Sequence, residues 1–181
     1  GRDLDQGGAT YNWVECSFVG LANLADSFQV LKEEVFDQHR LTLAQLRAIL
    51  EGDFHDQEAI RLRFLNAYPK YGQAHAPVDA LVAEAVHFVT EVCGQFKMYP
   101  DNSHYVPGAF VWVMHERLGQ ETGATPDGRR AHTPFADGAG PAQGRESRGP
   151  TAAILSTTCW DHSPFLGGVA FNMKFNTSLF R

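Results

Sequence analysis

Residues 119–150 read GQETGATPDGRRAHTPFADGAGPAQGRESRGP, and this stretch separates two regions with regular strand-like and helix-like patterns. About a third of it is Gly or Pro, against roughly one residue in eight in an average protein. Because Pro removes a backbone donor and Gly costs backbone entropy, neither a helix nor a central strand is expected here. Its length and apolar anchors such as Phe135 predict an ordered crossover rather than a slack linker.

Charged side chains within the crossover (residues 119–150) leave two roles open for it. Arg129 and Arg130 follow Asp127 in the sequence PDGRR, and guanidinium groups beside exposed backbone N–H groups suit a phosphate or carboxylate. The alternative is a structural clamp of the loop, because Gly128 follows Asp127 in a turn and Asp137 lies near enough in sequence to pair with an arginine. The clamp is the expected role, since the Gly-Lys-Ser/Thr ending of a phosphate-binding loop is missing.

Upstream of the crossover, residues 9–37 predict a strand followed directly by a helix. The strand is expected over residues 11–19, which are rich in aromatic and β-branched side chains. From Gly20 onward the apolar residues recur at spacings of three and four, which places them on one helical face. They are Leu21, Leu24, Ala25, Phe28 and Leu31.

Residues 42–98 predict a helix-rich insert. Thr42 and Gln45 have the spacing of a capping box at the start of its first helix. Asp56 is expected to cap the second helix, and Pro77 to begin the longest one.

Residues 106–116, VPGAFVWVMHE, predict a second strand. With a period of two, Phe110, Trp112 and Met114 share one face of this strand. The opposite face carries Val111, Val113 and His115. Both faces are largely apolar, as in a strand buried on both sides within an α/β fold.

After the crossover, residues 151–159 predict a short helix and residues 167–176 a third strand. Strands that alternate with helices indicate the α/β class.

Composition excludes several functions. The 181 residues carry a formal net charge of −6, whereas a general nucleic-acid binder presents a basic face. No apolar run approaches the roughly 18 residues that cross a bilayer. The histidines show no metal spacing such as His-Glu-x-x-His, so no metal site is expected.

The three cysteines, Cys16, Cys93 and Cys159, are widely separated in the sequence. They form neither a metal-type pair nor a disulfide framework, which favours a reducing cytoplasm. Buried structural thiols are the expected role of all three.

Several short motifs occur in an order that resembles the glycyl radical enzymes of the pyruvate formate-lyase type. They are residues 7–12 (GGATYN), 20–27 (GLANLADS), 125–131 (TPDGRRA), 135–138 (FADG), 149–152 (GPTA) and 172–175 (NMKF). The resemblance covers nearly the whole chain. It implies that residues 1–181 are a partial pyruvate formate-lyase-like domain, an internal piece of a longer chain.

The resemblance implies a ten-stranded α/β barrel, to which this chain would contribute a few strands and the helix-rich insert. In such enzymes a separate radical S-adenosylmethionine activase installs a glycyl radical. The radical converts a nearby cysteine to a thiyl, which removes hydrogen from the substrate. The chain has no Arg-Val-x-Gly-Tyr-like motif for the radical, and none of its cysteines lies in a Cys-x-Glu motif. No catalytic residue and no bound cofactor are therefore expected in this span.

In the family that the chain resembles, the strand before the TGATPDGRR-like motif helps to enclose the substrate. Phe110, Trp112 and Met114 are therefore candidates for the substrate cavity, the alternative being ordinary core. His104 and Tyr105, at the strand entrance, could offer a proton or a hydrogen bond, the alternative being a surface turn.

The resemblance also implies a small organic substrate, an activating enzyme as partner, a homodimer when intact, and a cytoplasmic location in anaerobic metabolism, with no nucleic acid or membrane. The reaction would be of the formate C-acetyltransferase type or of the dehydratase and lyase type. The amino-acid sequence of residues 136–156 resembles the dehydratase subgroup more closely. The alternative is a non-catalytic stand-alone remnant or subunit, which completes a split barrel with a partner chain.

Overall fold

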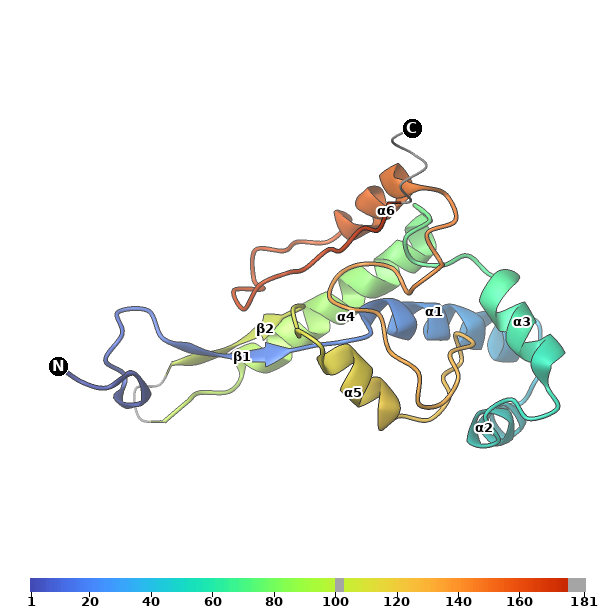
Figure 1. Cartoon of the computed structure of the whole chain (residues 1–181), viewed down its shortest axis with the longest axis horizontal. Helices are drawn as coiled ribbons and strands as arrows, with labels where there is room; N and C mark the ends of the chain where they lie inside the picture. Colours follow the sequence, from blue (N-terminus) through green and yellow to red (C-terminus); the bar gives the residue numbers. More distant parts are fainter. Residues whose placement is uncertain (100–102, 176–181) are drawn as a thin grey trace.

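The computed structural model describes residues 1–99 and 103–175 as an elongated molecule (Figure 1). A pair of strands lies near the N-terminal end, and α2 and α3 lie at the other end (Figure 1). In chain order the elements are η1 (Leu4–Gln6), β1 (Trp13–Ser17), α1 (Leu21–Leu31), η2 (Lys32–Asp37), α2 (Leu43–Glu51), α3 (Glu58–Asn66), α4 (Ala76–Gly94), β2 (His104–Gly108), α5 (Met114–Gln120) and α6 (Pro150–Thr157).

The two strands pair in parallel, in a register that runs from Trp13 opposite His104 to Ser17 opposite Gly108. A parallel pair needs a long crossover connection, and here the helices from α1 to α4 supply it. β1 lies within the predicted range 11–19, and the α/β class is confirmed. The described residues hold these two strands, so the ten-stranded barrel stays a prediction.

The strand predicted over residues 106–116 is wrong in its second half. β2 ends at Gly108, and the chain turns at Trp112, whose φ of 52° lies in the left-handed region. α5 then begins at Met114, and its sequence MHERLGQ contains good helix formers. A left-handed residue ends the extended run, so period two cannot continue past it.

The third predicted strand, residues 167–176, is reduced in the described part to one bridge between Val169 and Ala109. Three backbone bonds tie residues 167–170 to β2 and Ala109, but the glycines at 167 and 168 sit in a turn. Residue 176 lies outside the described residues. The predicted helix over residues 151–159 is present as α6.

Helix α4 carries the apolar stripe that its sequence predicts, with Val78, Val82 and Val86 buried at spacings of four. On α1 the prediction holds only in part: Leu21 and Ala25 are buried, whereas Leu24 and Phe28 are exposed. Across residues 1–99 and 103–175, the structure contains no helix with both the length and the apolarity that a bilayer crossing needs.

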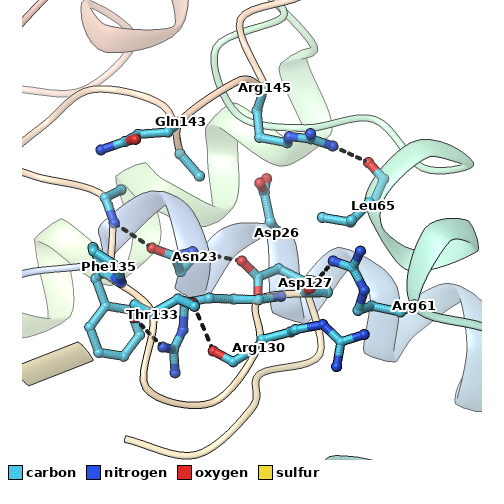
Figure 2. A pocket seen from close by; sticks show the side chains of 15 residues that line it. Asn23, Asp26, Arg61, Leu65, Asp127, Arg130, Thr133, Phe135, Gln143 and Arg145 are labelled. Carbon is cyan, nitrogen blue, oxygen red and sulfur yellow. Dashed lines mark hydrogen bonds between the residues drawn. The ribbon is translucent and has the colours of Figure 1, made fainter. Parts of the chain in front are cut away.

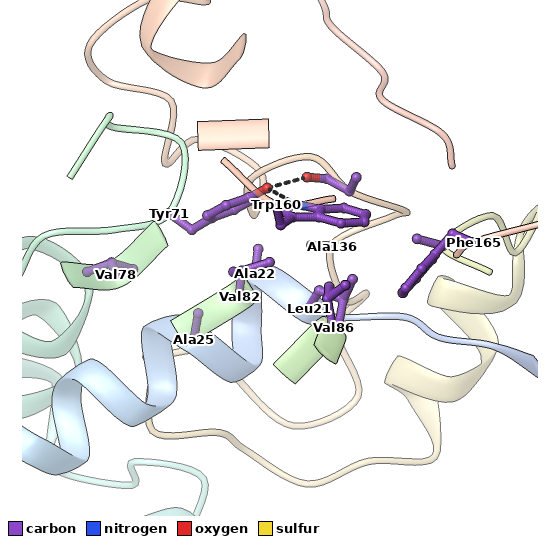
Figure 3. Close-up of a cluster of buried hydrophobic side chains, with 12 residues drawn as sticks. Leu21, Ala22, Ala25, Tyr71, Val78, Val82, Val86, Ala136, Trp160 and Phe165 are labelled. Carbon is purple, nitrogen blue, oxygen red and sulfur yellow. Dashed lines mark hydrogen bonds between the residues drawn. The ribbon is translucent and has the colours of Figure 1, made fainter. Parts of the chain in front are cut away.

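The main core lies between α1, α4 and the segments on either side of α6 (Figure 3). Tyr71 joins these layers, because its hydroxyl donates to the carbonyl of Ala139 at 3.0 Å and accepts from the indole N–H of Trp160 at 3.3 Å. The buried members are Leu21, Ala22, Ala25, Tyr71, Val78, Val82, Val86, Ala109, Ala136, Ala139, Trp160 and Phe165. The crossover supplies Ala136 and Ala139, so it is an ordered part of the fold, as its sequence predicted.

A second core forms where η2, α2 and α3 meet, with Phe54 and Phe64 edge to face at 6.0 Å. Beneath it the carboxylate of Glu34 is fully buried and accepts two bonds from Arg63, at 2.6 and 2.9 Å. The predicted cap at Asp56 is wrong: Gln57 is the N-cap of α3, and its side chain makes no capping bond.

The capping box at α2 is present as predicted, and it gives a first testable prediction. Thr42 Oγ1 accepts from Gln45 N at 3.2 Å, and Gln45 Oε1 accepts from Thr42 N at 2.8 Å. Thr42→Ala is expected to lower the free energy of unfolding by about 1 kcal/mol, because it leaves a helix N–H unpaired. Urea denaturation measures this loss. Gln57→Ala is the matched control, with no expected loss; equal effects would contradict the prediction.

Candidate functional site

Arg129 is the centre of the crossover. Its guanidinium is buried and donates to the carbonyl oxygens of Thr133, at 2.6 Å, and of Gly123. It also packs over the ring of Phe135, 4.1 Å from the ring centre. Burial lowers the pKa of Arg129 from its ordinary value. These contacts are those of a structural clamp, and they leave the guanidinium committed to the loop.

Asp127 and Asn23 connect this loop to α1. Asn23 donates its amide to the Asp127 carboxylate at 2.6 Å and accepts from the backbone N–H of Ala136 at 2.7 Å. Figure 2 shows Asn23 between these two parts of the crossover, with its hydrogen bonds drawn as dashed lines. Asp127 also accepts from Thr125 Oγ1 at 2.5 Å. Among the residues that the structure describes, Asp137 does not pair with an arginine as expected; it accepts from the Asn172 side-chain amide at 2.8 Å.

Arg130 connects the crossover to the helical insert. Its guanidinium donates to the carbonyl of Asp53 at 3.0 Å and to the carboxylate of Glu58 at 2.7 Å. About 42% of its side chain is exposed, so this ion pair is largely solvated. The contacts of Asp127, Arg129 and Arg130 therefore favour the clamp over the anion-binding alternative.

A polar cleft of about 390 Å³ lies beneath the crossover, and Asp26 is on its wall (Figure 2). Asp26 accepts from the backbone N–H of Tyr71 at 2.8 Å, while its second oxygen has no partner within the described residues. Burial raises the pKa of Asp26 to about 7, and the charge of Lys70 opposes that shift. Lys70 is itself buried, which lowers its pKa. Asp26 on the cleft wall and Lys70 close to it are thus two buried groups whose pKa values are shifted from their ordinary values.

A second surface lies on one side of the strands. Glu15 and Ser17 of β1 are exposed, whereas Val14 and Cys16 between them are half-buried. The Ser17 hydroxyl lies 2.9 Å from the carbonyl oxygen of Phe110 and also contacts the Glu15 carboxylate. We call the exposed side chains of Trp13, Glu15 and Ser17, with Gly108 beside them, the open sheet face.

Two glycines make room for Glu15 on this face. A Cβ placed at Gly108 would fall within 3.0 Å of the Glu15 carboxylate, and one at Gly167 would meet the Glu15 side chain equally closely. The side chain therefore lies flat across β2 toward residue 167, in a slot that any larger residue would fill.

Phe110 and Trp112 lie just past the carboxyl end of β2. Their rings are 5.6 Å apart, and the Trp112 side chain is 81% exposed. Met114 is 37% exposed and belongs to α5. The structure thus brings the two aromatic rings together beside the open sheet face, but it does not align all three side chains on one strand.

His104 and Tyr105 lie at the other end of β2. His104 is exposed, with its Nε2 atom 2.7 Å from Lys97 Nζ, and Tyr105 packs edge-on against Phe96 at 6.5 Å. Six residues of extended chain separate His104 from Phe110, a span of about 20 Å. The structure therefore does not bring these two candidates into the same site as Phe110.

The cysteines do not contribute to the open sheet face. Cys16 alternates with Glu15 and Ser17 and so points to the opposite side of β1. Cys93 is buried at the end of α4, as expected, whereas Cys16 is half-buried. Cys159 follows α6 and is exposed, so the expected burial of this thiol is wrong. Across residues 1–99 and 103–175, no three His, Cys, Asp or Glu side chains gather in a metal-binding arrangement.

The sequence reasoning missed Glu15 and Ser17 as site residues, although two polar residues two apart in a strand could have indicated an exposed face. It also missed Asn23 and Asp26. Polar residues in a helix are normally read as solvated, and here the crossover covers them. No local signal reveals that contact.

Comparisons with known proteins agree with this architecture. Residues 1–119 match the family model described as pyruvate formate lyase-like. The probable dehydratase YbiW of Escherichia coli is 39% identical over 97% of the chain. The trans-4-hydroxy-L-proline dehydratase of Clostridioides difficile is 31% identical over 99% of the chain.

A solved structure that describes 1,2-propanediol dehydration in Roseburia inulinivorans matches 93% of the chain, with 39% identity and a TM-score of 0.87. The chain spans about a fifth of the length of these proteins: 22% of the two relatives and of the solved chain. The family model covers well over half of the residues, in agreement with the motifs and the fold. The chain belongs to the pyruvate formate lyase-like family of glycyl radical enzymes.

Proposed function

We propose that the chain forms part of the barrel wall of a glycyl radical enzyme of the dehydratase or lyase type, and that its open sheet face looks into the substrate cavity. The observation that carries this proposal is the match to the Roseburia structure, with a TM-score of 0.87 over nearly the whole of this chain but 22% of that one. A part that superimposes this well on a larger enzyme is expected to occupy the same place in its own protein.

Exposed apolar side chains support a larger assembly. Leu24 and Phe28 on α1 are 41% and 46% exposed, and Trp112 and Val113 before α5 are 81% and 69% exposed. Large apolar side chains exposed in neighbouring positions, as in each of these two pairs, are typical of surfaces that another part of a protein covers. We propose that the rest of the barrel, which lies outside this span, packs against these side chains in the longer protein.

The radical chemistry would come from residues outside this span. A glycyl radical installed by an S-adenosylmethionine-dependent activase supplies hydrogen abstraction through a cysteine when both are present. Cys16, Cys93 and Cys159 lie off the open sheet face, which supports a catalytic cysteine elsewhere in the longer protein. The residues of this chain would shape the cavity, exclude water and hold the substrate near that cysteine.

The dehydratase relatives favour dehydration or a related elimination over formate C-acetyltransferase activity. The specific substrates of these relatives are not assigned to this chain. Its substrate is proposed to be a small organic molecule. The intact enzyme is proposed to be a cytoplasmic homodimer that depends on its activating enzyme.

The test uses the longer protein that contains this chain, activated without oxygen by its activase. The expected result is a glycyl radical signal in the electron paramagnetic resonance spectrum, with dehydration of 1,2-propanediol or a similar small diol. Activation without any radical signal would overturn the proposal. That result would favour the alternative, a non-catalytic subunit that completes a split barrel with a partner chain.

A further inference from the structure

The Glu15 carboxylate has no counter-charge. Among the described residues no Lys, Arg or His lies within ion-pairing distance of it, and its contact is with the Ser17 hydroxyl. It belongs to a strand whose neighbours Val14 and Cys16 are half-buried, and it lies flat in the slot left by Gly108 and Gly167. A placed but uncompensated carboxylate on a surface that faces a cavity can accept hydrogen bonds from a ligand.

The arginines of the cleft beneath the crossover do not serve this face, because their guanidinium groups are bonded within the crossover and the helical insert. Arg129 donates to loop carbonyls, Arg130 to Asp53 and Glu58, and Arg145 to the carbonyl of Leu65 at 2.9 Å. Lys97 and His104 lie together at the far end of this face, opposite Trp13. His104 is four residues from Gly108 along β2, about 13 Å of extended chain. Among the described residues, the end of the open sheet face at Glu15 and Gly108 therefore carries negative charge without an ion-paired cation. Such a surface repels an anionic ligand.

The aromatic pair adds an apolar edge to this surface. The Ser17 hydroxyl connects β1 to the carbonyl of Phe110, and the Phe110 ring packs on the exposed Trp112 ring. An aromatic face beside a carboxylate suits a short carbon skeleton with hydroxyl groups, and it also attracts an ammonium group.

We infer that Glu15 is a substrate-contacting residue that selects a neutral or cationic molecule bearing hydroxyl or ammonium donors, and that rejects anionic substrates. This inference rests on the proposed function, because the open sheet face faces a cavity only within the longer enzyme. Ser17 is a positioning residue, since its single hydroxyl proton is within reach of both the Glu15 carboxylate and the Phe110 carbonyl and can be donated to either. Gly108 and Gly167 keep the slot free.

The experiment measures binding of three molecules of similar size by calorimetry, with the longer protein before activation. They are 3-amino-1,2-propanediol, glycerol and glycerate, which carry positive, zero and negative charge. The unchanged protein is expected to bind them in that order. Glu15→Gln is expected to lower the affinity for the amine roughly tenfold and to raise the affinity for glycerate. The three affinities then become more nearly equal.

Glu51→Gln is the matched control. It removes the same charge from an exposed site at the end of α2, which lies at the other end of the molecule from the strands (Figure 1), and is expected to leave the order unchanged. Gly108→Ala is expected to displace the carboxylate and to flatten the preference in the same way, with Glu15 still present. A merely structural Glu15 would lower all three affinities equally.

Tighter binding of glycerate than of the amine by the unchanged protein, no binding of any of the three, or the same order in Glu15→Gln would each overturn the inference. The proposed function is tested separately by the radical signal. A radical with turnover but an unaltered preference in Glu15→Gln removes only this inference. If Glu15→Gln makes the three affinities more nearly equal but the protein gives no radical signal, the proposed activity is wrong and the role of Glu15 in binding stands.

Discussion

Replacing Arg129 with alanine is expected to lower the free energy of unfolding by at least about 3 kcal/mol. Arg129 is buried, with 7% of the residue exposed, and its guanidinium donates to the carbonyl oxygens of Thr133 and Gly123. Truncation leaves those carbonyls unpaired and removes the cation from the ring of Phe135. Urea denaturation followed by tryptophan fluorescence measures the loss.

Arg130→Ala is the neighbouring control. Its ion pairs with Asp53 and Glu58 are partly exposed, so a loss below about 1 kcal/mol is expected. Arg129→Lys is expected to restore little, because an ammonium cannot reproduce the planar fork that reaches Thr133 and Gly123 together. Equal losses for Arg129→Ala and Arg130→Ala would show that the crossover has no clamp at Arg129.

Asp26 is expected to make the chain less stable as the pH rises from about 4 to about 7. In the unfolded chain the carboxyl ionises near 3.8, whereas burial raises its pKa in the folded chain to about 7. Between these values the folded state binds the extra proton, so stability falls with rising pH and then levels off. Three pKa units at ~1.4 kcal/mol each correspond to a loss of about 4 kcal/mol at neutral pH.

Asp26→Asn removes this titration and can keep the bond from the Tyr71 N–H. The variant is expected to match the unchanged chain near pH 4 and to exceed it in stability near pH 8. In this variant the buried Lys70 loses a nearby negative charge that stabilises its ammonium group. This loss reduces the increase in the free energy of unfolding. Asp26→Asn combined with Lys70→Met removes both buried charges and is expected to show the full effect. A denaturation midpoint in Asp26→Asn that follows the same pH curve as the unchanged chain would contradict the assignment.

Local patterns predicted local structure well. The capping box at Thr42, the apolar stripe of α4, and the helix after Gly149 all depend on residues within a few positions of one another, and all are present. The ordered crossover was also predictable, since its Phe135 and its arginines need partners.

Features that depend on distant contacts were not predictable. Trp112 adopts a left-handed conformation that its residue type disfavours, so the end of β2 could not be read from an apolar run. Asn23 and Asp26 are polar residues of a helix, and their burial depends on a loop more than 100 residues away. The open sheet face depends on the alternation of exposed and half-buried residues in β1, which a run rich in aromatic and β-branched residues does not reveal.

The parallel register of β1 and β2 also determines when the strands can meet during synthesis. Trp13 precedes its partner His104 by 91 residues. At 5–20 residues per second, a ribosome needs roughly 5 to 18 s to make that interval. Because α1 to α4 lie within it and depend mainly on local contacts, they are expected to form while β1 still waits unpaired. The pairing of β1 with β2 is therefore expected to follow the formation of these helices.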